Sequence, residues 1–121
     1  MIPKIIHYCW LSNDEVPIEF KNYIEKWKEL NLSFDGIVSG FLGSERQIQI
    51  VKNMITEFKG PKTKVIVDPI MGDHGEAYAT YTESMCSKMK ELAEMADILT
   101  PNLTEACILT KRPYKKNAWS R

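Results

Sequence analysis

Acidic side chains stand in a stretch of the sequence where a loop is expected. Asp68 and Asp73 lie five residues apart around a proline and a glycine. Carboxylates in this pattern can hold Mg²⁺ through oxygen ligands, with water and phosphate oxygens completing the coordination. Aspartate and glycine are also ordinary turn residues, so a turn without a metal explains the pattern as well. The sequence leaves both interpretations open.

A second polar stretch, from Thr100 to Glu105, also allows two interpretations. Asn102 followed three residues later by Glu105 is a helix-capping pair, which requires no further function. The functional alternative is a helix N-terminus beneath a phosphate group, with Glu105 ordering a metal-bound water.

Other familiar chemical motifs are absent from the sequence. It has no G-x-x-x-x-G-K-[ST], G-x-G-x-x-G, D-x-D or G-x-S-x-G pattern. His7 is expected to be a core residue of a strand, and His74 a polar group of a loop. Cys9, Cys86 and Cys107 form no C-x-x-C pair or Cys/His cluster, which predicts free thiols.

The elements that must position these residues alternate along the chain. Short apolar runs predict strands at 4–11, 34–38, 64–67 and 98–99. Helical spacing and capping residues predict helices at 17–30, 44–58, 82–95 and 102–109. This order predicts an α/β fold with three α/β/α layers, in which helices cover both faces of a mostly parallel sheet.

Two local features sharpen this prediction. The first helix has an apolar stripe that we expect to be core, formed by Phe20, Tyr23, Ile24, Trp27 and Leu30. Ligands of parallel α/β folds bind beyond the carboxyl ends of the strands. That rule predicts a site in the loops at 39–44, 68–78 and 100–105.

Composition narrows the possible functions. The 121 residues are 44% hydrophobic and 26% charged, with a formal net charge of zero, which argues against a general nucleic-acid-binding protein. No apolar run approaches ~20 residues, so no membrane span is expected. The N-terminus lacks the features of a secretion signal, so we expect a cytoplasmic protein. The basic residues after position 110 are expected to form a solvated end.

Three motifs resemble the middle of a pyridoxal (pyridoxine/pyridoxamine) kinase of the ribokinase-like superfamily. They are DGIVSGFLGS at 35–44, VDPIMGD at 67–73 and ADILTPNLTEA at 96–106. The resemblance covers residues 31–121. It implies vitamin B6 salvage, in which the γ-phosphoryl group of Mg·ATP passes to the 5′-hydroxymethyl group of pyridoxal, pyridoxine or pyridoxamine.

The same resemblance implies roles for individual residues. Phe41 stands where the family presents an aromatic ring to the pyridine. Positions near the ATP phosphates and the metal are those of Asp73, Tyr78, Thr100, Asn102 and Glu105. Asp73 and Glu105 would serve the metal, and the family's frequent homodimers make self-association an open expectation.

The sequence departs from this family in two ways. The G-x-G-D anion hole, whose aspartate is the family's catalytic base, does not occur in it. We therefore expect no catalytic residue here and a chain that is incomplete and inactive alone. Residues 1–29, beginning MIPKIIHYCW, resemble instead the start of bacterial D-x-D sugar-nucleotide glycosyltransferases.

These departures predict two segments. A glycosyltransferase-like strand and helix would occupy residues 1–30, joined to a ribokinase-like fragment at 31–121. A gene rearrangement, a mis-assembled reading frame or a deliberate fusion would each produce such a join. Two alternatives to a kinase fragment stay open, namely a non-catalytic structural or interaction domain and a glycosyltransferase fragment.

Overall fold

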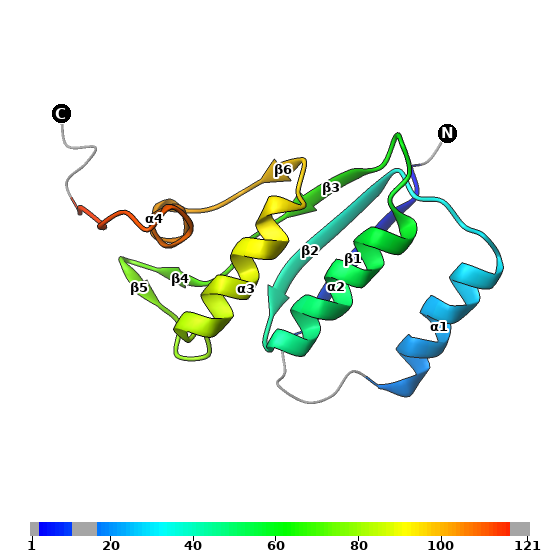
Figure 1. Cartoon of the computed structure of the whole chain (residues 1–121), viewed down its shortest axis with the longest axis horizontal. Coiled ribbons are helices and arrows are strands. Elements are labelled where there is room, and N and C mark those ends of the chain that lie inside the picture. The colour runs from blue at the N-terminus through cyan, green and yellow to red at the C-terminus, as the bar shows by residue number, and fades with distance from the viewer. Residues whose placement is uncertain (1–2, 11–16, 117–121) are drawn as a thin grey trace.

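A computed structural model describes residues 3–10 and 17–116 of the chain, and the side chain of Cys9 lies outside the described set. Strands and helices alternate along it (Figure 1). They are β1 (Ile5–Trp10), α1 (Ile18–Glu29), β2 (Gly36–Leu42), α2 (Glu45–Phe58), β3 (Lys64–Val67), β4 (Gly72–Asp73), β5 (Glu76–Ala77), α3 (Glu83–Glu94), β6 (Ile98–Leu99) and α4 (Leu103–Thr110). No helix among the described residues is long and apolar enough to cross a bilayer.

Four strands form one parallel sheet in the order β1-β2-β3-β6. The register pairs Ile6 with Ile37, and Ile37 in turn with Val65. Strand β2 continues through Leu42, beyond the predicted end at Val38, because it pairs with β1 as far as Trp10. The predicted α/β class and parallel sheet are confirmed.

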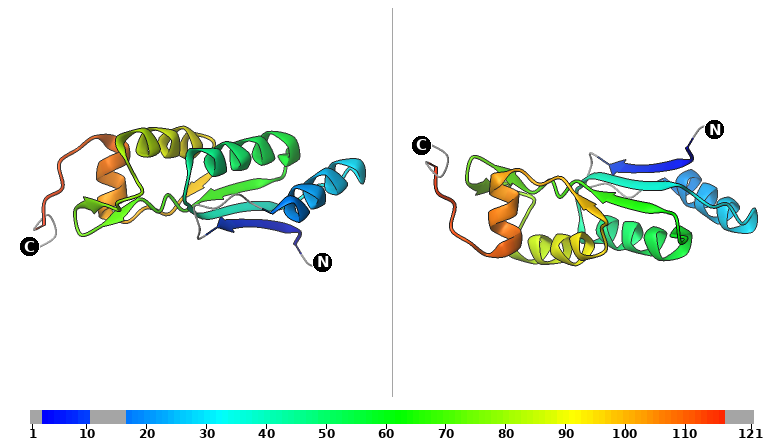
Figure 2. Two further views of the ribbon diagram at one scale, coloured as in Figure 1. Left: turned by 90° about the horizontal axis from the view of Figure 1, so that it is seen from below. Right: turned by 90° about the horizontal axis from the view of Figure 1, so that it is seen from above.

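Helices α2 and α3 lie side by side on one face of this sheet (Figure 2). The expected second layer of helices, on the opposite face, is not formed by the described residues. Each crossover leads to the next strand in the same direction. Because such crossovers share one hand, they place their helices on the same side of the sheet.

The core lies between the sheet and these two helices. Alternate residues of β2 and β3, including Ile37, Val65 and Val67, are almost completely buried. The fully or nearly fully buried side chains of the two helices are Ile48, Val51, Ile55, Met89 and Leu92. Their spacing is that of one helical face, as the sequence predicted. The caps predicted at Ser44 and Thr82 are also present.

The apolar stripe of α1 is the main error of the sequence prediction. None of its residues is buried, and Phe20, Tyr23 and Leu30 are at least half exposed. The helix lies outside α2, at the end of the row of helices (Figure 1), so its contacts are confined to one narrow side. Trp27 makes the main contact, with its ring 5.8 Å from that of Phe34.

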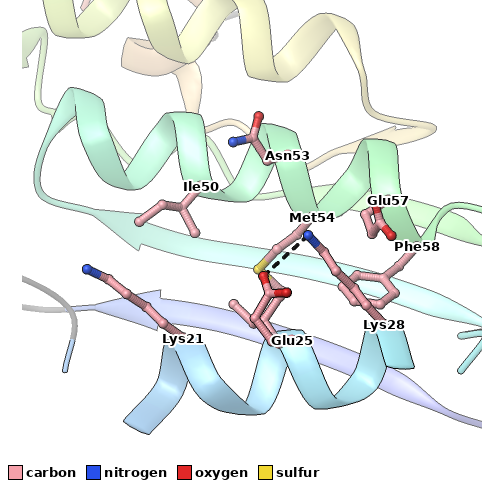
Figure 3. Close-up of a pocket in the computed structure, with 9 residues that line it drawn as sticks. Lys21, Glu25, Lys28, Ile50, Asn53, Met54, Glu57 and Phe58 are labelled. Atoms are coloured by element: carbon pink, nitrogen blue, oxygen red, sulfur yellow. Dashed lines mark hydrogen bonds and ion pairs between the residues drawn. The ribbon is translucent and has the colours of Figure 1, made fainter. Parts of the chain in front are cut away.

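A shallow groove separates α1 from α2 (Figure 3). It measures about 250 Å³ and has Lys21, Lys28 and Glu57 along its rim and Met54 and Phe58 at its base. Lys28 and Glu25 of α1 pair at 3.5 Å. The groove explains why the packing of this helix depends on the aromatic contact at one end.

The prediction that His7 is a core residue is also wrong. His7 is exposed, whereas its neighbour Ile6 is buried. Side chains of a strand point alternately to opposite faces, and His7 faces the side without helices. The other free thiols stand as predicted, since Cys86 and Cys107 are half-buried and unpaired.

The aromatic contact yields a prediction for stability. Phe58 is buried against Trp27 and Phe34, with ring centroids 6.3 and 5.5 Å away. Phe58→Ala should lower the free energy of unfolding by about 3–4 kcal/mol, because it leaves a cavity. Chemical denaturation followed by tryptophan fluorescence measures this change. The control Phe20→Ala, half exposed on α1, should cost less than ~1 kcal/mol, and equal effects would contradict the packing described.

Candidate functional site

The three predicted loops meet at the carboxyl edge of the sheet, as the sequence analysis expected. The Asp68 amide donates to the Ser39 carbonyl at 3.1 Å, which joins the second loop to the end of β2. The Thr100 amide donates to the Val67 carbonyl at 3.3 Å, which joins the third loop to β3. Helix α4 and the hairpin β4–β5 lie beyond this edge (Figure 1).

The loop at 68–78 contains a hairpin that the sequence analysis did not predict. Strands β4 and β5 pair antiparallel through a two-residue turn at His74 and Gly75, whose φ angles are 51° and 86°. Two positive φ angles are typical of the tight turns that join paired strands. At Gly72 a Cβ atom would lie 2.2 Å from the Glu76 carbonyl oxygen, so this close approach requires glycine.

The first turn of α4 holds this hairpin in place. The Asn102 side-chain amide donates to the Gly72 carbonyl at 2.9 Å. The Thr104 hydroxyl accepts the Gly75 amide at 2.8 Å. The Glu105 carboxylate accepts the Met71 amide at 3.2 Å. Three consecutive polar side chains near one helix end therefore fix the backbone of the hairpin.

Asn102 and Glu105 also form the predicted capping box. The Glu105 amide donates to the Asn102 side chain at 2.8 Å, and the Asn102 amide donates to the Glu105 carboxylate at 2.8 Å. Glu105 is only 4% exposed, and each of its two oxygens accepts a backbone amide. The carboxylate therefore does not present its oxygens to an ion in solvent.

Asp73 is the exposed carboxylate of the site. One of its oxygens accepts the amide of His74 at 2.8 Å, and the other lies 3.4 Å from the His74 ring. This contact is the turn chemistry that the sequence analysis offered as the alternative to a metal. Tyr78, Thr100 and Asn102 are exposed along the same edge. Within residues 3–10 and 17–116 no three acidic, histidine or cysteine side chains gather closely enough to hold a metal.

Phe41 lies against a residue that the sequence analysis missed. Its ring and that of Tyr81 meet edge to face, with centroids 6.2 Å apart. The Tyr81 hydroxyl donates to the Leu42 carbonyl at 2.6 Å, so it joins the end of β2 to the segment before α3. Burial raises the pKa of the Tyr81 phenol well above its usual range, which keeps the donating proton in place. The one sequence signal was an aromatic residue just before a predicted helix cap.

A larger cavity lies behind Tyr81, between α3 and α4. It measures about 690 Å³, and its lining combines Tyr81, Cys86 and Ile108 with the charged side chains of Lys90 and Glu94. Burial raises the pKa of the Cys86 thiol. Asp73, Thr100, Asn102 and Glu105 are not part of this lining, so the predicted site residues form an open ledge at the sheet edge instead.

Comparison with known proteins identifies relatives of this architecture. The family model described as phosphomethylpyrimidine kinase matches residues 26–120. A pyridoxine/pyridoxal/pyridoxamine kinase of Bordetella avium is 31% identical over 110 residues, which cover 86% of this chain and 37% of that protein.

Solved structures agree with these matches. A phosphomethylpyrimidine kinase structure from Bacteroides thetaiotaomicron, in a crystal form with pyridoxal, has a TM-score of 0.76 and 41% identity. That match covers 85% of this chain and 36% of the solved one. A pyridoxal kinase from Staphylococcus aureus in complex with ADP has a TM-score of 0.66 and 25% identity, covering 87% of this chain and 36% of that one.

Two facts follow from the extent of these matches. The chain spans between 23% and 37% of the length of the first curated relatives. Residues 30–121 are 92 of 121, or 76% of the chain, so a match covering 86% includes part of the first 29 residues. All the relatives described are kinases, and the predicted glycosyltransferase resemblance of residues 1–29 receives no support from them.

The buried carboxylate yields a prediction about the hairpin. Glu105→Ala should lower the free energy of unfolding by about 2–4 kcal/mol, because it removes a cap and leaves two backbone amides unpaired. Urea denaturation measures the loss. Glu76→Ala, an exposed change on the hairpin itself, is the matched control and should cost under ~0.5 kcal/mol. A loss for Glu105→Ala no larger than the control's would contradict the hydrogen bonds assigned here.

The phenol yields a second prediction. Tyr81→Phe should cost about 1–3 kcal/mol, because the buried Leu42 carbonyl loses its donor while the ring contact with Phe41 is retained. Tyr78→Phe, at an exposed tyrosine three residues earlier, should have almost no effect. Thermal unfolding of both variants compares them. The account would be wrong if the two melting temperatures fell equally.

Proposed function

This chain belongs to the phosphomethylpyrimidine kinase family, and we propose that it carries part of an ATP-dependent kinase site for a vitamin B6 compound. The observation that carries the proposal is the meeting of three motif-bearing loops at one edge of the sheet, held by Asn102, Thr104 and Glu105. The B6 preference rests on the names of its relatives, which are pyridoxal and pyridoxine kinases.

The nucleotide end of the proposed site is formed by the hairpin and the start of α4. Tyr78, Thr100 and Asn102 are exposed there, and the positive end of the helix dipole favours a phosphate group. The Staphylococcus aureus relative was solved with ADP, which supports a nucleotide as the ligand. Family kinases act by positioning and charge neutralisation more than by covalent chemistry.

Asp73 is the residue that fits a magnesium ion. Its carboxylate is exposed at the hairpin turn, and Mg²⁺ in kinase sites is bound by one or two carboxylates together with substrate phosphates. The metal role predicted for Glu105 does not fit direct contact, because that side chain is buried and hydrogen-bonded. We propose that Glu105 acts through the position of Asn102 and the hairpin. A bound ion would neutralise charge on the phosphates.

Phe41 forms the proposed contact with the pyridine ring. It is half-buried at the end of β2, and its edge-to-face contact with Tyr81 fixes the direction of its ring. A flat aromatic ligand can stack on a ring held in this way. The Bacteroides thetaiotaomicron relative was crystallised with pyridoxal, which supports an aromatic substrate of this size.

We propose that turnover requires further kinase segments beyond these residues. The G-x-G-D motif does not occur in this sequence, and the relatives contain about three times as much chain. Losing an anion hole and its base removes factors of ~10² or more in rate for each element. The cytoplasmic location, the homodimer and the division into residues 1–30 and 31–121 stay predictions.

A non-catalytic domain is the second candidate function. It is favoured by the same capping box, since Asn102 and Glu105 use their polar atoms to hold the hairpin and the helix end. In that case the loops are structural. Binding of Mg·ATP separates the two candidates.

A nucleotide titration tests the proposal. Adding Mg·ATP to the ¹⁵N-labelled chain should shift the amide signals of residues 72–78 and 100–105. Asp73→Asn should weaken the magnesium-dependent binding by about tenfold, because it removes the exposed charge. Glu76→Gln, on the other strand of the hairpin, should leave binding unchanged. Nucleotide-independent spectra would favour the structural candidate.

Product formation tests the second part of the proposal. Purified chain with pyridoxal and Mg·ATP should yield no measurable pyridoxal 5′-phosphate. Turnover that disappears in the Asp73→Ala variant would contradict the requirement for further segments and would instead make these residues a sufficient kinase.

A further inference from the structure

The face of the sheet opposite α2 and α3 carries an apolar row that crosses all four strands. The strand register aligns His7, Val38, Ile66 and Ile98 on this face. Val38 and Ile66 are half-buried by their neighbours alone, and Ile98 is 47% exposed. Ile5, one pleat away on β1, is also 47% exposed. Figure 2 shows no described helix along this side.

The central strand adds a second feature to the same face. Gly36 and Gly40 flank Val38 at alternate positions of β2, so all three belong to the face without helices. Glycine inside a strand weakens it and frequently marks a place where another backbone approaches closely. The two glycines leave a flat strip on each side of Val38 across which a helix can pack.

Parallel sheets are found almost exclusively with both faces covered, because their strands are apolar on both sides. This sheet follows the rule in composition and departs from it in coverage. A row of Val and Ile across four strands is therefore an interaction surface with an absent partner. Lys64 lies exposed at the amino end of β3 on the same face, which favours an acidic group at that end of the partner.

We propose that this face binds the helical layer formed by the other two thirds of a kinase of this family, supplied by a separate polypeptide. The inference rests on the proposed function. The chain corresponds to 36% of the Bacteroides thetaiotaomicron structure, so 64% of that fold has no counterpart in it. The chain would then act as one part of a split kinase, with amphipathic helices of the partner covering Val38 and Ile66.

Co-expression tests the inference. The probe is the Bacteroides thetaiotaomicron kinase from which the stretch matched by this chain has been deleted and replaced by a flexible linker. We expect a soluble one-to-one complex, measured by analytical ultracentrifugation. A deleted kinase that stays insoluble or separate in the presence of the chain would overturn the proposal, as would self-association of this chain through the same face.

Methyl NMR locates the contact. A soluble paramagnetic probe should broaden the methyl signals of Ile5, Val38, Ile66 and Ile98 in the free chain. In the complex this broadening should fall at least threefold, while the buried Ile37 and Val65 stay unaffected in both states. Protection confined to other surfaces would overturn the assignment of this face.

Two substitutions complete the test. Ile66→Lys should weaken the complex at least tenfold without changing the helix content or cooperative unfolding of the free chain, because the side chain lies on the uncovered face. Ile18→Lys, on α1 and 62% exposed, is the matched control and should leave the complex intact. Equal effects would contradict the proposal.

The two hypotheses fail separately. A complex that protects this face but phosphorylates no B6 compound retains the interaction surface and contradicts the proposed substrate. Nucleotide binding at the hairpin without any complex retains the proposed site and contradicts the split kinase.

Discussion

The attachment of the hairpin β4–β5 to the first turn of α4 is the constraint on which the candidate site depends. Strand β6 and hairpin residues lie far apart in sequence, and each strand of the hairpin has only two residues. Such a short hairpin is not stable alone. Asn102, Thr104 and Glu105 supply the missing interactions, and Glu105 is buried by this contact. The same residues cap the helix, so hairpin position and helix end are fixed together.

This arrangement connects the fold to the proposed chemistry. Phosphoryl transfer depends on holding charged groups at defined positions, and a rigid ledge at the end of a parallel sheet does so. Tyr81 extends the rigidity to the end of β2, where Phe41 lies. The chain can therefore place a nucleotide contact and an aromatic contact on one side of a site. The opposite side and the covering of the second sheet face are left to other segments in this account.

Sequence reasoning predicted the elements that local physics determines. The caps at Ser44, Thr82 and Asn102 were identified because a side chain bonds a backbone amide three residues later. The prediction was wrong where tertiary placement decides, as with His7, whose strand has one uncovered face, and with the stripe of α1. The hairpin and the Tyr81 hydrogen bond to Leu42 depend on contacts between distant segments, which no local pattern reports.

The most direct test of this account is native-state amide hydrogen exchange of the free chain. The Met71 and Gly75 amides, which donate to Glu105 and Thr104, should exchange with the same protection as the amides of α4, because hairpin and helix open together. The neighbouring His74 amide, bonded only within the turn, should exchange faster. Exchange of Met71 and Gly75 at the rate of an unstructured loop, while α4 stays protected, would contradict the central claim.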